Sequence, residues 1–335
     1  MISAQPQQPT TDKSVLKLIA PYRDPSIRSS VWQLTNTLVP YIILWIAMIY
    51  LVPFSWWYIL PLILLATGFT VRLFIIFHDC GHGAFFRSKT ANDTVGTVLG
   101  ILTFTPYHRW HHAHLMHHRT SGNLDKRGEG DVWTLTVDEY KNLPHKKRLI
   151  YRIYRNPFVM FGLGAPLMFL VSNRFTRKGF SRKERISVYV TNAGIALVVF
   201  GLSWLIGFKT YLMIQIPITY IASVVGVFLF YVQHQYPEVN WYRDENWDYT
   251  SAAMHGASYF KLPRLLQWFS GNIGFHNIHH LSSKIPNYRL QKCYHENEAF
   301  RQEAPVTLLK SLKTLKLRLW DEQKKQLVTW REALG

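Results

Sequence analysis

The segment WWYILPLILLATGFTVRLFIIFHDCGH, residues 56–82, joins a long apolar run to two closely spaced histidines. From Trp56 to Phe77 the residues are apolar almost throughout, and about 20 such residues are needed to cross the hydrocarbon core of a bilayer. The run therefore predicts a membrane-spanning helix. His78 and His82 follow it at i, i+4 spacing, which places two side chains on one face of a helix. This segment predicts a histidine pair at the end of a membrane span.

Further apolar blocks predict three more membrane helices. Leu38–Phe54 precedes the first segment, and Ile186–Phe208 and Tyr211–Val232 form a second pair across a short turn. Two other apolar stretches, 95–107 and 157–171, contain Gly or Pro and are too short to span comfortably. We expect these two stretches at the membrane interface or in re-entrant positions.

The distribution of charge predicts the orientation of these helices. The chain has 38 Lys and Arg against 20 Asp and Glu, a net charge of +18. Such an excess suits either nucleic acid or an anionic membrane face, but the basic residues flank the apolar blocks and form no separate arm, which favours the membrane. Eighteen Lys and Arg lie between Phe77 and Ile186, whereas the turns inside the two helix pairs hold none and one. By the positive-inside tendency, the long segment is predicted to be cytoplasmic.

We therefore predict an all-α integral membrane protein, with four transmembrane helices and a cytosolic helical domain that holds a histidine-rich site. No nucleic-acid partner is expected. The predicted segments are an N-terminal cytosolic tail (1–30), a first helix pair (31–77), a cytosolic segment with interfacial helices (78–185), a second helix pair (186–232) and a C-terminal cytosolic segment (233–335).

Arg72 and the cysteines are assigned structural roles. A charge inside a span is a functional candidate by default, but Arg72 lies within two helical turns of His78, so we expect its side chain to reach the lipid headgroups. Cys80 and Cys293 form no disulfide framework, which fits a reducing, cytosolic environment. Cys80 is expected to be a small packed residue.

Three further groups of histidines extend the pattern begun by His78 and His82. Two of them have i, i+3, i+4 spacing, and the last is a single histidine at the end of the fourth predicted span: His114, His117 and His118; His276, His279 and His280; and His234. The predicted topology places all these residues on one side of the membrane. One ion seldom uses more than four protein histidines, and acidic residues are sparse near the clusters. The nine residues therefore predict a histidine-bound site for two metal ions.

The motifs HDCGH (78–82), HAHLMHH (112–118) and GFHNIHHLSSKIPNYRL (274–290), with YVQH (231–234), resemble the three histidine boxes and extra histidine of membrane fatty acid desaturases. SGNLDKRGEGDVWTLTVDEY and YFKLPRLLQWFSGNIG are similar to the acyl-lipid desaturases of Bacillus and its relatives, including the Δ5 enzyme. The resemblance covers residues from about 30 to 320. It implies an O2-dependent desaturase with two iron ions, which inserts a cis double bond into acyl chains of membrane phospholipids. The implied ligands are His78, His82, His114, His117, His118, His234, His276, His279 and His280.

Other polar residues in or near the boxes receive weaker assignments. His108, His111 and His112 match no ligand position, and we expect them at the surface or behind the ligands. Ligating imidazoles usually donate their other N–H to an acceptor. Three residues are candidates for that role, with a capping or turn role as the alternative for each: Asp79, Asp125 and Asn272.

Three differences from other groups of desaturases narrow the resemblance. The first box has three residues between its histidines, where the acyl-CoA Δ9 group typically has four, and the third begins with His276, where front-end desaturases have Gln. No HPGG haem-binding element is present. The resemblance thus implies an external electron donor such as ferredoxin or flavodoxin, which the basic cytosolic face suits. It also implies a multi-pass protein of the bacterial plasma membrane with its active site facing the cytoplasm.

Two alternatives remain at this point. Alkane hydroxylases and carotenoid hydroxylases or ketolases have similar boxes, although the tail HHLSSKIPNYRL favours desaturation. A metal-binding or metal-transporting membrane protein would place polar residues at mid-bilayer, and apart from Arg72 these spans almost lack them. The residues leave the double-bond position open, and the resemblance favours Δ5.

Overall fold

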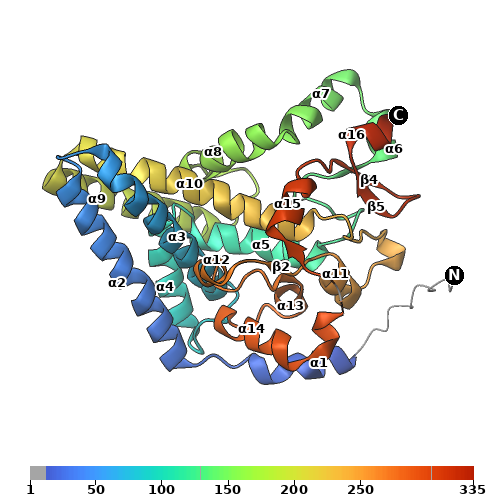
Figure 1. Cartoon of the computed structure of the whole chain (residues 1–335), viewed down its shortest axis with the longest axis horizontal. Coiled ribbons are helices and arrows are strands. Elements are labelled where there is room, and N and C mark those ends of the chain that lie inside the picture. Colours follow the sequence, from blue (N-terminus) through green and yellow to red (C-terminus); the bar gives the residue numbers. More distant parts are fainter. Residues whose placement is uncertain (1–12, 129, 303) are drawn as a thin grey trace.

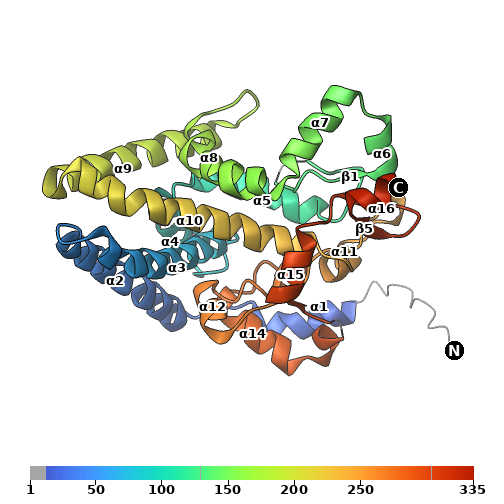
Figure 2. The ribbon, with the colours of Figure 1, turned by 45° about the horizontal axis from the view of Figure 1, so that its top comes forward.

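The computed structural model describes residues 13–128, 130–302 and 304–335. Among these, four helices are long and apolar enough to cross a membrane: α2 (Ile27–Leu51), α3 (Trp56–Gly81), α9 (Arg182–Ile206) and α10 (Phe208–His234). The prediction of four spans in two pairs is confirmed, and α2 begins well before its apolar block. Figure 2 shows the pair α2 and α3 lying below the pair α9 and α10.

Local sequence explains where these helices begin and end. The hydroxyl of Ser26 accepts the N–H of Ser29 at the start of α2. Ser181 and Glu184 form a reciprocal capping box at the start of α9, which satisfies backbone donors that the first turn leaves open. Gly207 ends α9 with a φ of +85°, a conformation that glycine adopts without steric cost. α10 can therefore begin at the next residue and run back beside α9.

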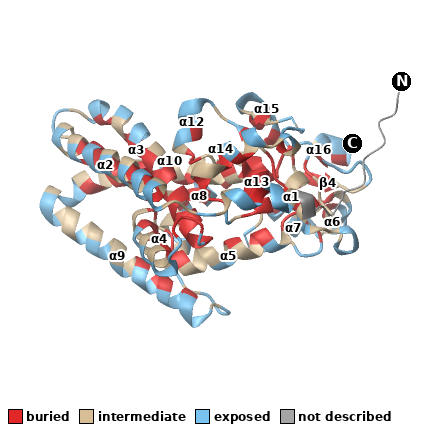
Figure 3. Ribbon diagram, turned by 90° about the horizontal axis from the view of Figure 1, so that it is seen from below, coloured by how far each residue is buried: buried red, intermediate tan, exposed pale blue. Residues whose placement is uncertain are grey.

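The two helix pairs pack on a shared apolar core centred on α3. Tyr41 and Trp45 of α2, Ile63 of α3, and Tyr211 and Ile214 of α10 belong to one buried cluster. Inside the protein, 61% of the apolar window of α3 is buried, against 17% of that of α9. Figure 3 shows this contrast, with the outward surface of α9 largely exposed. Such long apolar surfaces indicate contact with lipid.

The segment between the helix pairs begins with two helices that pack on the spans. α4 (Lys89–Leu102) contacts α3 and α9, and α5 (Tyr107–Thr120) contacts α9 and α3. With 14 residues, α4 is too short to cross a bilayer. The segment continues through β1 (Leu135–Thr136), α6 (Val137–Asn142), α7 (His145–Tyr154), the π-helix η2 (Phe158–Gly164), α8 (Ala165–Leu170) and η3 (Ser172–Arg174).

The stretch around 157–171 forms part of a bent helical unit. α7 and the helical residues Phe158–Arg174 meet at an angle of 68°, and together they are long and apolar enough for a broken span or a re-entrant loop. This bend is compatible with the predicted re-entrant position of residues 157–171.

Short helices and strands make up the remaining described chain. The N-terminal part holds α1 (Lys13–Ile19) and η1 (Ala20–Tyr22). After α10 the elements are η4 (Asp244–Asn246), α11 (Tyr249–His255), β2 (Phe260–Lys261), α12 (Arg264–Phe269), α13 (His276–Leu281), α14 (Asn287–Glu296), η5 (Glu298–Arg301), β3 (Val306–Thr307), α15 (Leu308–Thr314), β4 (Leu319–Asp321), β5 (Gln326–Val328) and α16 (Trp330–Leu334). The protein is thus mostly helical, as predicted, with α5 and α13 near its centre (Figure 1).

The strands are two or three residues long and tie distant segments together. β1 pairs in parallel with β4, with Leu135 opposite Leu319, and β4 pairs with β5 in antiparallel fashion. β2 pairs in parallel with β3, with Phe260 opposite Val306. These pairings attach the C-terminal residues to the segments that surround the histidines.

The expectation for Arg72 is wrong. Its side chain does not reach the headgroups, because the residue is only 6% exposed and lies against α12. The guanidinium lies 3.9 Å from the ring centroid of Trp268, bonds the carbonyl of the same residue and donates to the hydroxyl of Thr37 over 3.2 Å. Arg72 therefore joins α3 to α2 and α12. Cys80 is buried in the apolar core, as expected of a small packed residue.

Candidate metal centre

Nine buried histidines converge in two groups at the ends of α3 and α10. Within each group, one nitrogen from every ring lies within 4.8 Å of the others. The first group is His78, His82, His114, His118 and His279, and the second is His117, His234, His276 and His280. The structure therefore brings together all nine residues that the sequence motifs singled out.

Helical periodicity explains how two helices serve both groups. In α5, His114 and His118 are one turn apart and face the first group, whereas His117 faces the second. In α13 the arrangement is reversed, because His276 and His280 face the second group and His279 the first. The end of α3 adds two histidines to the first group, and the end of α10 adds one to the second.

The two groups adjoin one another. The rings of His118 and His280, one from each group, stack with centroids 4.2 Å apart. Within the first group, Nε2 of His118 lies 3.1 Å from Nε2 of both His114 and His279, so the ring that contacts the second group also belongs to the centre of the first. Two ions held by the two groups would therefore be neighbours.

In His117 and His234, Nδ1 is hydrogen-bonded to an oxygen outside the histidine groups. If the ring is neutral, Nε2 then carries a lone pair that faces the site. Nδ1 of His117 lies 2.5 Å from a carboxylate oxygen of Asp131, and Nδ1 of His234 lies 3.2 Å from the carbonyl oxygen of Gly256. Both oxygens only accept, so each Nδ1 donates, and in a neutral ring Nε2 is then unprotonated. Yet these two Nε2 atoms lie only 3.2 Å apart. Two such nitrogens, both turned toward the same point, can bind one metal ion, so the donor set fits a metal ion.

The nitrogens of the first group also fit a metal ion. Nδ1 of His78 donates to Asp79 over 3.1 Å, while Nε2 of His78 is buried without a hydrogen-bond partner among the described residues. Burial lowers the pKa of His114, His118 and His279 well below the usual value for histidine. These rings are therefore neutral, which is the form that binds metals.

A chain of hydrogen bonds supports His78 from behind. Asp79 accepts the backbone N–H of Asn287 at 2.7 Å and its side-chain amide at 2.8 Å. The oxygen of the same amide accepts from Gln33 of α2 over 2.8 Å. Asp79 thus has the contact expected of a residue that orients a ligand, and α2 and α14 hold it in place.

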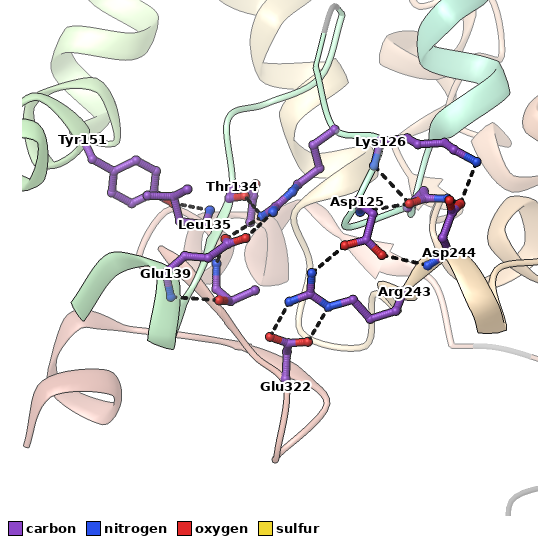
Figure 4. Close-up of polar contacts among 12 residues, drawn as sticks. Asp125, Lys126, Thr134, Leu135, Glu139, Tyr151, Arg243, Asp244 and Glu322 are labelled. Carbon is purple, nitrogen blue, oxygen red and sulfur yellow. Dashed lines mark hydrogen bonds and ion pairs between the residues drawn. The ribbon is translucent and has the colours of Figure 1, made fainter. Parts of the chain in front are cut away.

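Asp125 and Asn272 do not contact a ligand histidine in the described part of the chain. Asp125 accepts from Arg243 at 2.6 Å and from the backbone N–H of Asp244 at 2.8 Å (Figure 4). Asn272 has a φ of +59° and donates to the carbonyl of Asn287 over 3.3 Å. Both have the loop and turn roles that the sequence left as the alternative.

Asp131 was missed by sequence reasoning. It follows Gly130, which has a φ of +92° and where a Cβ atom would lie 2.8 Å from the carbonyl oxygen of Ala113. The loop can therefore press against α5 only with glycine there, and this approach brings Asp131 to His117. The adjacent glycine is the one feature of the sequence that could have drawn attention to it.

The other histidines of α5 lie outside both groups. His108 and His111 are half-buried and His112 is exposed. Burial, and after it the charge of Lys183, lowers the pKa of His108 to about 4. These residues occupy the outer side of α5, as expected.

A largely apolar cavity of about 570 Å³ extends to the histidines. Its wall includes His78, His114 and His276, together with residues of α3, α5, α8 and α10. The ring of Trp110 stacks on His114 at 4.4 Å between centroids and borders the same space. The volume falls in the range of about 300–1,000 Å³ that is usual for small-molecule sites. The geometry suits an apolar ligand that reaches the metal centre.

Comparisons with known proteins agree with this geometry. Residues 54–310 match the family model described as fatty acid desaturase. A fatty acid desaturase of Bacillus subtilis (strain 168) is 46% identical over 319 residues, which cover 95% of this chain and 91% of that protein. The sn-1 oleoyl-lipid 12-desaturase of Synechocystis sp. (strain ATCC 27184 / PCC 6803 / Kazusa) is 30% identical over 70% of this chain and 67% of its own length. The sn-1 acyl-lipid omega-3 desaturase (ferredoxin) of Nostoc sp. (strain 36) is 28% identical over 70% and 66%.

Proposed function

The chain belongs to the fatty acid desaturase family, and on that premise we propose that it inserts a cis double bond into acyl chains of membrane phospholipids at a histidine-bound di-iron centre. The observation that carries the proposal is the cavity, because its largely apolar wall includes histidines from both groups. The enzyme is an oxidoreductase.

The nine histidines are proposed as the iron ligands. The first group would hold one ion with up to five imidazoles and the second would hold the other with four. Imidazole suits iron, and the donor set contains neither thiolate nor carboxylate. Bound iron would supply the redox chemistry in which O2 is reduced to two waters by two hydrogens from the acyl chain together with two electrons from the external donor and two protons.

Residues of the chain itself bind and orient the substrate in this proposal. Phe74, Val227 and Phe230 belong to the cavity wall and exclude water from the acyl chain. Asp79 and Asp131 fix the rings of His78 and His117, so that the nitrogens facing the metal keep their direction.

The substrate is proposed to enter from the bilayer. Thr70 and Val71 of α3 and Ala222 of α10 lie in the cavity wall, and both helices are membrane spans. In this proposal an acyl chain from the membrane reaches the site between these two helices. We propose the Δ5 position on the resemblance of the sequence motifs.

We also propose that the protein lies in the plasma membrane with its histidines on the cytoplasmic side, where the excess of Lys and Arg favours that orientation. An acidic ferredoxin or flavodoxin is the proposed electron donor. The name of the Nostoc relative includes ferredoxin, and the basic face of this chain complements such a carrier.

Mass spectrometry of products tests the proposal. The protein would be expressed in a host whose lipids are saturated and fed palmitate labelled with deuterium at C5 and C6. We expect monounsaturated phospholipids with a cis double bond at Δ5 and two deuterium atoms lost. A hydroxylated chain that has lost a single deuterium would contradict desaturation, and a double bond elsewhere would contradict only the position.

A further inference from the structure

Two cations line the described wall of the cavity, Arg109 and Arg177, and they differ in how their charge is balanced. Arg109 lies 3.9 Å from Glu184, and its guanidinium stacks on the ring of Phe180 at 4.3 Å. Arg177 is exposed, and no carboxylate of the described residues forms an ion pair with it. Its charge is therefore available to a ligand.

We infer from its position in the chain that Arg177 lies at the depth of the lipid headgroups. It lies between η3, which ends at Arg174, and the membrane span α9, which begins at Arg182. Arg174 is already engaged, because it donates to the carbonyl of Phe104 over 2.6 Å and to Asn192 over 2.8 Å. Phe175, which is exposed, borders the cavity beside Arg177. An apolar wall and a free cation thus meet where a span enters the interface.

The positive charge around Arg177 disfavours headgroups that carry an ammonium or choline group. The segment Arg177–Arg185 carries five cationic side chains, Arg177 included, against one carboxylate, Glu184. The carboxylate of Glu184 is occupied by the capping box with Ser181. Such a field attracts a phosphate but repels an ammonium or choline group. A headgroup with a phosphate and no amine suits it best.

We propose that Arg177 binds the phosphate of the substrate lipid and makes the enzyme prefer acyl chains of anionic phospholipids, such as phosphatidylglycerol, to those of zwitterionic ones. The inference rests on the proposed function and names its substrate class. The phosphate lies against Arg177, and the acyl chain of the same lipid passes along Phe175 into the cavity.

A competition experiment in one bilayer tests this assignment. Full-length protein in nanodiscs would receive equal amounts of phosphatidylglycerol and phosphatidylcholine, with acyl chains that carry different isotopic labels. Both lipids then meet the same surface charge, donor and protein, so only recognition of the headgroup changes the product ratio. We expect the wild-type protein to favour phosphatidylglycerol by about fivefold, since one basic residue near the membrane surface contributes roughly that factor.

Matched variants separate a specific contact from general surface charge. Arg177→Gln should bring the ratio close to one, and Arg177→Lys should keep most of the preference. Lys178→Gln removes the same charge from the next residue, which does not line the cavity and so does not contact the bound phosphate. Its more distant charge is screened by salt, so the ratio should change by less than about twofold.

Each outcome has a defined meaning. Equal product from both lipids with wild-type protein overturns the inference and leaves the proposed function intact. An unchanged ratio in Arg177→Gln, or an equal loss in Lys178→Gln, overturns the assignment to Arg177. If neither lipid yields product, the proposed function is overturned and the inference fails with it.

Discussion

The carboxylate of Asp131 lies 2.5 Å from Nδ1 of His117, although the two residues come from a loop and a helix 14 positions apart in the chain. The contact fixes the ring so that Nε2 faces the second histidine group. Asp79 has the same relationship with His78 in the first group. Each group therefore contains one histidine whose orientation depends on a carboxylate.

Replacing Asp131 with Asn should weaken the centre without unfolding the protein. The amide is the same size but lacks the negative charge that holds the Nδ1 proton, and loss of such partners costs roughly 10–100-fold in metal affinity or activity. Iron per chain, measured by mass spectrometry after dialysis against a chelator, should fall together with turnover. Asp138→Asn, an exposed residue on α6, is the control, and equal iron retention in both variants would contradict the assignment.

Removing the Asn287 side chain should affect the first group from a distance. Asn287→Ala deletes an amide that donates to Asp79 and accepts from Gln33, which leaves buried polar groups without partners at about 1–3 kcal/mol each. We expect a lower melting temperature and less bound iron. Gln33→Ala removes only the hydrogen bond from Gln33 to Asn287, so it should reduce bound iron less than Asn287→Ala does. A larger loss of iron in Gln33→Ala would contradict this chain of contacts.

Substitution of single histidines tests whether the two groups act as one centre. His117→Ala, His234→Ala and His279→Ala should each abolish product formation, since each removes a proposed ligand. His145→Ala, at the exposed start of α7, should retain full activity. If His234→Ala remains active at normal rates, α10 contributes no ligand.

The ion-pair network around Arg243 should stabilise the protein in a manner that depends on pH. Arg243 joins Asp125 and Glu322 (Figure 4). The N–H of Asp244, and after it Arg243, lowers the pKa of Asp125 below its usual 3.8. A carboxyl with a lowered pKa stabilises the fold above its unfolded value, and this contribution is lost as the pH falls through the folded value.

Arg243→Gln should therefore lower the melting temperature at pH 7, and the difference from wild type should shrink below about pH 4 as the carboxylates become protonated. Thermal unfolding in detergent at several pH values measures this. If the difference in melting temperature between the variant and wild type grows as the pH falls, the ion pairs of Arg243 do not stabilise the protein as proposed.

Turnover should slow as salt rises when an acidic ferredoxin or flavodoxin supplies electrons. The net charge of +18 attracts such a carrier, and the screening length falls from about 10 Å at 0.1 M salt to roughly 3 Å at 1 M. The loss should appear in the association rate, measured as the desaturation rate against donor concentration. An association rate that is flat or rises with salt would exclude steering by the basic face.

Periodicity allowed much of this arrangement to be predicted from the sequence. The length of the apolar runs indicated four spans, and the i, i+3, i+4 spacing selected six of the nine histidines. His78, His82 and His234 were selected because they lie at the ends of predicted spans and match the family motifs. Their division between the groups was not predictable, because it depends on the rotation of α5 relative to α13. Spacing along one helix says which side chains share a face, and says nothing about which neighbour that face meets.

The residues behind the histidines were harder to predict for a related reason. Asn287 reaches Asp79 across 208 positions of the chain, and Arg72 reaches Trp268 across 196. Neither contact has a local pattern. The misplacement of Arg72 followed from treating α3 as a lone helix in lipid, whereas α12 supplies an aromatic ring and a carbonyl for the guanidinium to bind.

Because α5 and α13 each contribute histidines to both groups, the two groups can be completed only late in synthesis of the chain. Both groups include ligands from α13, so neither is complete until the ribosome has passed His280 and that helix has docked. All four candidate spans and most of the chain have been synthesised by then. A nascent protein therefore holds no complete histidine group, and the proposed metal loading would require the nearly full-length chain.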